Sequence, residues 1–269
     1  MDLKIGFIGG GQMAEALIKG LLDKGMATED TLSASDPSQA RREHLSKQYG
    51  IRVWERNQPV LEFSNVLILA VKPQVMKIVL DDIAASVTES HILISIAAGI
   101  STAYLEKGLP GHARVIRVMP NTPALVQKGA AALCKGTKAS KQDLEVALAI
   151  FDSVGEAVVV PESMMDAVTG LSGSGPAYVF QFIQAMVDGG VLEGLPRDIA
   201  QRLAVQTVLG AAEMCKRSGK NPAELTAMVT SPGGTTIQGI YEMERDGFRG
   251  SVMAAVSAAT ARSKELGGE

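Results

Sequence analysis

The sequence predicts an α/β fold: a doubly wound parallel sheet in the N-terminal part and an all-α C-terminal part. Two observations carry this prediction. Short apolar runs alternate with helix-like stretches up to about residue 160, whereas only helix-like stretches follow Pro161. Strand–helix alternation is typical of parallel sheets that carry helices on both faces. We therefore expect one domain at residues 1–160 and a second at residues 161–269.

The apolar runs of the first domain are expected to form its strands. Val and Ile dominate them, and several lack polar alternation, as strands buried on both faces should. These strands are expected at residues 3–8, 31–35, 66–71, 92–96, 115–119, 130–134 and 157–160. Helices are expected between them at residues 14–22, 37–49, 75–87 and 141–151. Ser140 and Asp143 have the spacing of an N-terminal capping pair for the last helix.

The helices of the second domain often begin with Pro in or next to the first turn. They are expected at residues 176–193, 196–216, 222–229, 235–245 and 248–264. Segments such as 210–212 (GAA) and 254–256 (AAV) leave little polar face. Such helices either fill a buried core or form an interface between subunits. We favour the interface, and so expect a homodimer.

Composition and charge exclude several function classes. The 269 residues carry a formal net charge of −3 without a basic run, so nucleic acid is not an expected partner. No stretch reaches the about 18 consecutive apolar residues of a membrane span, and no signal peptide precedes the first strand. Cys134 and Cys215 are expected to be reduced core residues, so we expect a cytoplasmic protein without a membrane partner. His44, His91 and His112 lack ligand neighbours in the sequence, so we expect surface histidines and no metal site.

A glycine-rich turn follows the first expected strand and opens a helix. Its sequence GGGQMA at residues 9–14 fits the dinucleotide fingerprint G-x-G-x-x-A of the Rossmann fold. Gly9 permits a tight turn, Gly11 allows a pyrophosphate to approach the backbone, and Ala14 allows close packing of helix on strand. We therefore expect a Rossmann domain with cofactor contacts at Ile8, Gly9, Gly10, Gly11, Gln12 and Met13.

The end of the second strand bears on the choice between NAD and NADP. An acid here, Asp36, usually binds the ribose hydroxyls of NAD and repels the 2′-phosphate of NADP. However, Ser35 and Ser38 offer donors for a phosphate, and Arg41 and Arg42 follow on the next helix. Asp36 also suits the N-cap of that helix. Ser35 and Asp36 are therefore expected cofactor contacts, and both cofactors stay open on this evidence.

Two more loops follow strands at the edge where open α/β sheets bind ligands. Small residues and an early Pro suit backbone contacts to a cofactor, and they suit an ordinary turn nearly as well. The expected contacts are Ala70, Val71, Lys72, Pro73, Ala97, Ala98 and Gly99.

Four longer motifs make the chain resemble pyrroline-5-carboxylate reductases. They are AVKPQ at residues 70–74, RVMPNTPA at 117–124, DAVTGLSGSGPAY at 166–178 and TSPGGTT at 230–236. The resemblance spans nearly the whole chain. It implies hydride transfer from NAD(P)H to the C=N bond of 1-pyrroline-5-carboxylate, which gives L-proline. It also implies NADPH as the cofactor, with NADH kept open by Asp36, and a homodimer that in some members joins into a ring of dimers.

The resemblance assigns the substrate site to the second domain. The turn at residues 231–236 opens a helix and offers N–H groups and hydroxyls to a carboxylate. Thr236 is expected closest to the substrate, as the catalytic residue, Glu162 near the ring nitrogen, and Asn57 on the nicotinamide side of the cofactor site. The remaining expected substrate contacts are Ser231, Gly233, Gly234 and Thr235. The segment 172–176 is expected to form a tight interhelical turn.

Two other functions use the same plan. A β-hydroxyacid dehydrogenase has a Rossmann and a helical domain but uses a catalytic Lys, and Lys216, Lys220 and Lys264 stand in polar helix ends that suit a desolvated Lys poorly. A regulator that binds a dinucleotide without catalysis needs only the first domain. Turnover of 1-pyrroline-5-carboxylate distinguishes both from the reductase.

Overall fold

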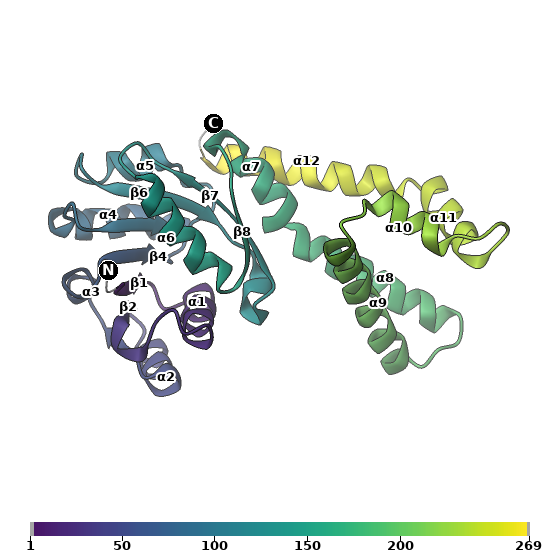
Figure 1. The fold of residues 1–269 in the computed structure, drawn as a ribbon, viewed down its shortest axis with the longest axis horizontal. Helices are drawn as coiled ribbons and strands as arrows, with labels where there is room; N and C mark the ends of the chain where they lie inside the picture. The colour runs from purple at the N-terminus through teal and green to yellow at the C-terminus, as the bar shows by residue number, and fades with distance from the viewer. Residues whose placement is uncertain (1–2, 268–269) are drawn as a thin grey trace. The chain divides into compact units, whose positions relative to one another are not determined.

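The computed structural model describes residues 3–267, so residues 1–2 and 268–269 of the expected domains lie outside it. The chain forms two compact units. We call Met1–Ser174 together with Ala258–Glu269 the sheet unit, and Gly175–Ser257 the helical unit. Figure 1 shows the elements of each.

The sheet unit is built on an eight-stranded sheet in the order β3-β2-β1-β4-β5-β6-β7-β8. Its neighbouring strands run parallel except for β6 and β7, which are antiparallel. The parallel sheet is thus confirmed apart from this pair, and the edge strand β3 was not predicted. The strands are β1 (Ile5–Ile8), β2 (Leu32–Ser35), β3 (Arg52–Trp54), β4 (Val66–Leu69), β5 (Ile92–Ser95), β6 (Arg114–Met119), β7 (Gly129–Lys135) and β8 (Gly155–Val159).

Three short helices of the sheet unit were not predicted: α3 (Gln58–Phe63), α5 (Thr102–Lys107) and α7 (Met165–Val168). The Ser140–Asp143 capping box at the start of α6 is confirmed. The helix expected at 75–87 is shorter, because its end becomes a 3-10 turn at Ala84–Ser86. The helices are α1 (Gln12–Asp23), α2 (Gln39–Tyr49), α3 (Gln58–Phe63), α4 (Met76–Ile83), α5 (Thr102–Lys107), α6 (Lys141–Asp152) and α7 (Met165–Val168).

Helices cover both faces of this sheet (Figure 1). Successive strand residues point to opposite faces, so Phe7 and Ile8 belong to different cores. Phe7 lies in a cluster with residues of α1 and α6, whereas Ile8 lies in a cluster with residues of α3, α4 and α5. Both side chains are at most 1% exposed. This frame holds the ends of the strands in fixed register.

The sheet unit extends past the domain boundary expected near Pro161. Met165 of α7 is fully buried against Ala132 and Cys134 of β7, and the Ser263 hydroxyl donates to the Asp166 carboxylate at 2.6 Å. The boundary between the two compact units therefore falls after Ser174 and not near Pro161. The turn expected at 172–176 is instead a π-helical segment, Thr169–Gly173, that leads from α7 into α8.

The helical unit holds the predicted helices, and α12 extends from it into the sheet unit. Its helices are α8 (Gly175–Leu192), α9 (Arg197–Ser218), α10 (Pro222–Val229), α11 (Thr235–Arg245) and α12 (Phe248–Gly267). Their buried cluster is small, comprising Val187, Ala200 and Ala204. Many large apolar side chains are exposed instead, among them Phe180, Leu192, Leu203, Leu209, Met228 and Met253.

Several expectations about single residues were wrong. Cys215 is exposed, not part of a core, whereas Cys134 is buried as expected, and burial raises the pKa of its thiol to about 12. His91 is buried rather than on the surface, because its ring lies between the Thr88 N–H and the Leu61 carbonyl. Within residues 3–267, no helix combines the length and apolar character that a membrane crossing requires.

Candidate dinucleotide and substrate sites

The expected cofactor loops meet at one edge of the sheet. Ile8 at the end of β1 pairs with Ser35 of β2 and with Leu69 of β4, and Leu69 pairs with Ser95 of β5. Because these strands are parallel, the loops that follow them lie at their common carboxyl edge. The chain order reverses at β1, between β2 and β4. Such a switch point is where doubly wound sheets bind dinucleotides.

The glycine turn after β1 has the backbone that a pyrophosphate site needs. Gly9 has a φ of +97°, and a Cβ there would lie 2.6 Å from the Ala70 carbonyl oxygen. At Gly11 a Cβ would meet nothing within 4 Å, so the approach to this residue is open. Gly11 is the N-cap of α1 and supplies no side-chain cap, which leaves the first N–H groups of the helix for an anion.

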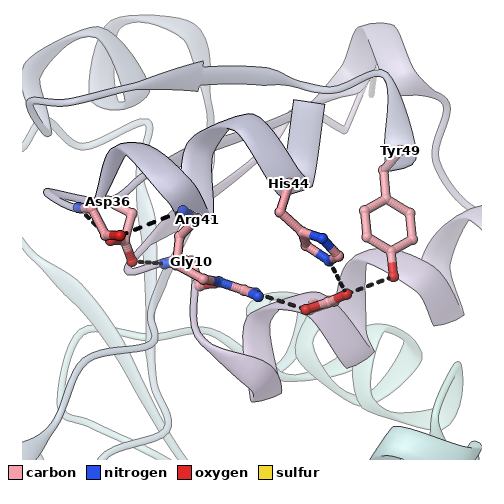
Figure 2. Close-up of polar contacts among 7 residues, drawn as sticks. Gly10, Asp36, Arg41, His44 and Tyr49 are labelled. Carbon is pink, nitrogen blue, oxygen red and sulfur yellow. Dashed lines mark hydrogen bonds and ion pairs between the residues drawn. The ribbon is translucent and has the colours of Figure 1, made fainter. Parts of the chain in front are cut away.

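Asp36 has a different role from the helix cap considered in the sequence (Figure 2). The N-cap of α2 is Ser38, whose hydroxyl accepts from the Arg41 N–H. Asp36 instead accepts the Gly10 N–H on Oδ2 and the Ser38 N–H on Oδ1, each at 2.8 Å. Its carboxylate therefore joins the glycine turn to the loop after β2.

Arg41 holds the same turn from the other side. Its Nε donates to the Gly10 carbonyl oxygen at 2.8 Å, and its terminal nitrogen bonds Glu15 Oε2 at 2.7 Å. Glu15 also accepts from His44 at 2.6 Å and from the Tyr49 hydroxyl at 3.1 Å. Partial burial raises the pKa of Glu15, but the bonds from His44, Arg41 and Tyr49 outweigh burial and lower it overall.

Neither the role of Glu15 nor the bond from Arg41 to the glycine turn was predicted, and the expectation that His44 has no carboxylate partner was wrong. Glu15 is an acid in the first turn after the fingerprint, and Arg41 and His44, three residues apart, share one face of the next helix, which ends at Tyr49. That pattern was the available signal. It was ambiguous, because α1 and α2 are neighbours only once the sheet has formed.

The side chains of Ser35 and Asn57 form a hydrogen bond. The buried Ser35 hydroxyl donates to Asn57 Oδ1 at 2.7 Å, and the Asn57 amide donates to Asp82 at 2.8 Å. Asn57 follows β3, which pairs with β2 at the outer side of the switch point, away from β5. The nicotinamide-side role of Asn57 stays a prediction; the loops after β4 and β5 lie on the other side of β1 from β3.

The loops after β4 and β5 complete this edge. Lys72 is exposed and precedes the 3-10 turn Pro73–Val75, while Ala70, Val71 and Pro73 are partly covered. After β5, Ala97 is buried, Ala98 is exposed and Gly99 has a φ of +73°. A Cβ on Gly99 would lie 3.6 Å from Leu266 at the end of α12, so the C-terminal helix supports this loop.

Glu162 lies in the sheet unit with its carboxylate engaged. Oε1 accepts the Thr102 N–H at 2.7 Å and an Arg117 N–H at 3.2 Å, and Oε2 accepts the Thr102 hydroxyl. Burial raises the pKa of Glu162, but the bonds from Thr102 and Arg117 outweigh it, and the pKa lies below its usual value. The group therefore stays ionised and joins the starts of α5 and α7 to β6.

The turn at residues 231–236 lies in the helical unit, and α11 opens at Thr235 as predicted. The Gly234 N–H donates to the Ser231 carbonyl at 3.0 Å, and Gly233 has a φ of +66°. A Cβ on Gly234 would lie 2.3 Å from the Ser231 hydroxyl oxygen. Within the described residues, the exposed hydroxyls of Thr235 and Thr236 form no hydrogen bond. The turn thus offers backbone and hydroxyl donors to a ligand.

No candidate metal site accompanies these residues. Over residues 3–267, no group of three or more His, Cys, Asp or Glu side chains is arranged to hold an ion.

Comparison with known proteins identifies the family. The model described as pyrroline-5-carboxylate reductase dimerisation matches residues 162–266, and that of the NADP oxidoreductases, coenzyme F420-dependent, matches residues 4–99. A pyrroline-5-carboxylate reductase of Methanosarcina acetivorans is 50% identical over 264 residues, covering 98% of each chain. One from Arabidopsis thaliana is 44% identical, covering 98% of this chain and 96% of its own.

Solved structures agree with these sequences. The pyrroline-5-carboxylate reductase of Coxiella burnetii superposes with a TM-score of 0.94 at 34% identity, covering 99% of both chains. The Plasmodium falciparum pyrroline carboxylate reductase, solved with NADP bound, gives 0.88 at 34% identity, covering 98% of both. The dinucleotide fold, the helical unit and these full-length likenesses agree. The chain therefore belongs to the pyrroline-5-carboxylate reductase family.

Proposed function

We propose that this chain reduces the C=N bond of 1-pyrroline-5-carboxylate to L-proline with NADPH, and with NADH as a second cofactor. The family membership over the full chain supports the reaction. The single structural observation that supports it is the open glycine turn at the switch point, which suits the dinucleotide that this reaction needs: Gly11 has free space where a side chain would be, next to the uncapped start of α1.

A bound reduced nicotinamide would supply the hydride for this reaction. The residues proposed to hold the cofactor are those of the carboxyl edge. The turn at residues 9–13 takes the pyrophosphate on backbone N–H groups, and the loops at 70–73 and 97–99 take the nicotinamide half. Ser35, Asp36 and Asn57 are proposed to take the adenosine ribose half, a revision of the expected role of Asn57 that the strand order β3-β2-β1 supports.

The charge of Asp36 disfavours a 2′-phosphate, but its contacts reduce this effect, so NADPH stays the cofactor proposed first. Each Asp36 oxygen already accepts one backbone N–H, so the carboxylate is less available to ribose hydroxyls than a free acid would be. Arg42 lies close by and donates to the Asp36 and Pro37 carbonyls at 2.8 and 2.9 Å. The NADP-bound Plasmodium relative supports the same choice.

The substrate carboxylate is proposed to bind the turn at residues 231–236. Thr236 supplies a hydroxyl and Thr235 supplies an N–H group at the start of α11, Gly233 and Gly234 shape the turn, and Ser231 closes it by accepting the Gly234 N–H. The protonated imine is the better hydride acceptor, so the proton arrives with the substrate rather than from a side chain. The chain's own contribution is then orientation, which brings donor and acceptor carbons to about 3–3.5 Å.

For Glu162 we propose an electrostatic role. Its oxygens already accept bonds from Thr102 and Arg117, so the carboxylate stays in place and favours a cationic ligand through its charge. Glu162→Gln should therefore raise the KM for the imine, with nucleotide binding unchanged.

We also propose that the protein works as a homodimer, in the cytoplasm. The match to a dimerisation family covers residues 162–266, and exposed apolar side chains gather on the helices of the same region. Both cysteines are free, as is usual in a reducing compartment. Light scattering at decreasing concentration tests the dimer; a monomer at every concentration would contradict it.

An activity assay tests the reaction. Purified protein with 1-pyrroline-5-carboxylate and NADPH should lose the absorbance of reduced nicotinamide while proline accumulates. Absence of turnover with both NADPH and NADH would contradict the reductase, and turnover of a β-hydroxyacid instead would support the dehydrogenase. The ratio of kcat/KM for NADPH to that for NADH should rise in Asp36→Ser. An unchanged ratio would mean that Asp36 serves only the turn.

A further inference from the structure

Gly10 is held through both of its backbone polar groups by side chains from the segment after β2 (Figure 2). Its N–H donates to Asp36 and its carbonyl accepts from Arg41 Nε, each at 2.8 Å. The Gly10 carbonyl and the Gly11 N–H belong to one planar peptide unit and point in opposite directions. The bond from Arg41 therefore fixes the direction of the Gly11 N–H.

Arg41 is in turn held by Glu15. The two side chains are 31% and 23% exposed, and their ion pair is 2.7 Å long. Glu15 also binds His44 and Tyr49, so three side chains of α2 converge on one carboxylate of α1. Burial and the hydrogen bond to Glu15 raise the pKa of Tyr49 to about 12, so its hydroxyl remains a donor. Such a network is more rigid than an exposed pair.

We propose that Arg41 and Glu15 are positioning residues for the nucleotide. Arg41 orients the Gly10–Gly11 peptide toward the pyrophosphate, and Glu15 acts through Arg41. The inference rests on the proposed function, since it assumes that the glycine turn binds a dinucleotide. It differs from a phosphate-binding role for Arg41, because the pyrophosphate is common to NADH and NADPH. Loss of Arg41 should then weaken both cofactors equally.

Calorimetric titration of the full-length protein with NADPH and with NADH tests the proposal. Arg41→Ala should raise the Kd of both nucleotides by the same factor, about tenfold, with kcat retained at saturating nucleotide. Glu15→Gln should raise both by a smaller equal factor. The double variant should be no weaker than Arg41→Ala. Arg41→Lys should not restore binding, because an ammonium lacks the planar fork that reaches Gly10 and Glu15 together.

Controls separate positioning from a general loss of structure. Lys47→Ala removes an exposed cation from the same helix and should leave both Kd values unchanged. Hydrogen exchange of the nucleotide-free protein should show faster exchange at Gly11 in Arg41→Ala, with the strands unaffected. Should Arg41→Ala not fold, Glu15→Gln keeps the shape of the side chain and carries the test.

Three results would overturn the inference. A loss confined to NADPH would make Arg41 a contact to the 2′-phosphate. Unchanged Kd values in Arg41→Ala would remove its role, and full recovery in Arg41→Lys would show attraction by charge instead of orientation. Failure of the proposed function is distinct, because it appears in the unaltered protein, as absence of turnover or of nucleotide binding, and not as a difference between the variants.

Discussion

Large apolar side chains are buried in the sheet unit but exposed in the helical unit. In the sheet unit, Phe7 is fully buried between strands and helices, whereas in the helical unit Phe180 is 63% exposed and Leu192 is 84% exposed. The sheet unit completes its core within one chain. The helical unit does not, and its apolar helices are the surface that we propose a second copy covers. The sheet unit thus provides stability within one chain, and the helical unit is the region proposed for assembly between chains.

The two proposed ligand sites also differ in whether they lie on buried or on exposed elements. The dinucleotide turn lies on buried strands and is fixed by Asp36 and Arg41. The turn at residues 231–236 lies on exposed helices, with Thr235 and Thr236 free to meet a ligand. One unit offers a rigid site for a large cofactor, and the other offers hydroxyls and N–H groups for a small anion.

The largest effect is expected from the buried phenylalanine. Phe7→Ala should lower the free energy of unfolding by about 3–5 kcal/mol, because it leaves a cavity beneath β1. Denaturant titrations at several protein concentrations should give the same loss. Phe180→Ala is the matched variant; its loss should be small where monomers dominate and should grow as concentration rises and dimers form, because the side chain is exposed in one chain and is proposed to be covered in the dimer. Equal, concentration-independent losses would contradict the contrast between the units.

A side chain at Gly11 should have the next largest effect, which is on the affinity for the nucleotide. Gly11→Val puts a side chain into open space, so folding should be retained while the Kd for NADPH rises about a hundredfold, near 2.7 kcal/mol. Gly111→Val, also at a glycine with no atom within 4 Å of its Cβ position, is the control. Calorimetry that gives equal NADPH affinity for both variants would show that the nucleotide binds elsewhere.

Thr236 probes the helical unit alone. Thr236→Ala should weaken use of 1-pyrroline-5-carboxylate by about 1–3 kcal/mol in kcat/KM, because the bound substrate carboxylate loses a hydroxyl donor. Thr236→Ser keeps the hydroxyl and should retain most of the activity. Initial rates at saturating NADPH provide the measurement, and equal losses in both variants would place the hydroxyl outside the site.

The smallest expected effect is the contribution of Glu162 to the free energy of unfolding, which should be lost in acid. The pKa of Glu162 is lower in the folded chain than its ordinary value of 4.5, so its contribution is present above about pH 4.5 and is lost as pH falls through the folded pKa. The carboxylate is partly exposed, so this contribution should be at most about 1 kcal/mol. Glu162→Gln should be less stable than the unaltered protein near neutral pH, and the difference should vanish in acid. A difference independent of pH would contradict the ionic account.

Periodicity predicted most of the fold because the long elements have strong patterns. It missed β3, whose three residues begin with the exposed Arg52, and the six-residue helix α3. It also could not give the direction of β7, since a buried strand has the same composition in either direction. The boundary near Pro161 marked where strands end, but burial of Met165 under β7 is a tertiary contact.

The backbone of the candidate site was predicted where a motif determines its shape, as at Gly9 and Gly11. Contacts between side chains of different elements were not predicted. The ribose contact of Asp36 stays a prediction, its bond to Gly10 was not foreseen, and Glu15 was not singled out at all. These contacts depend on the placement of α2 beside α1, which no local pattern encodes.

The central claim is that the sheet unit binds the nucleotide and the helical unit binds the substrate carboxylate. Titrating NADPH into Gly11→Val and Thr236→Ala tests it most directly. The account predicts that Gly11→Val loses NADPH affinity, while Thr236→Ala binds NADPH like the unaltered protein. Equal losses of NADPH affinity in the two variants would contradict it.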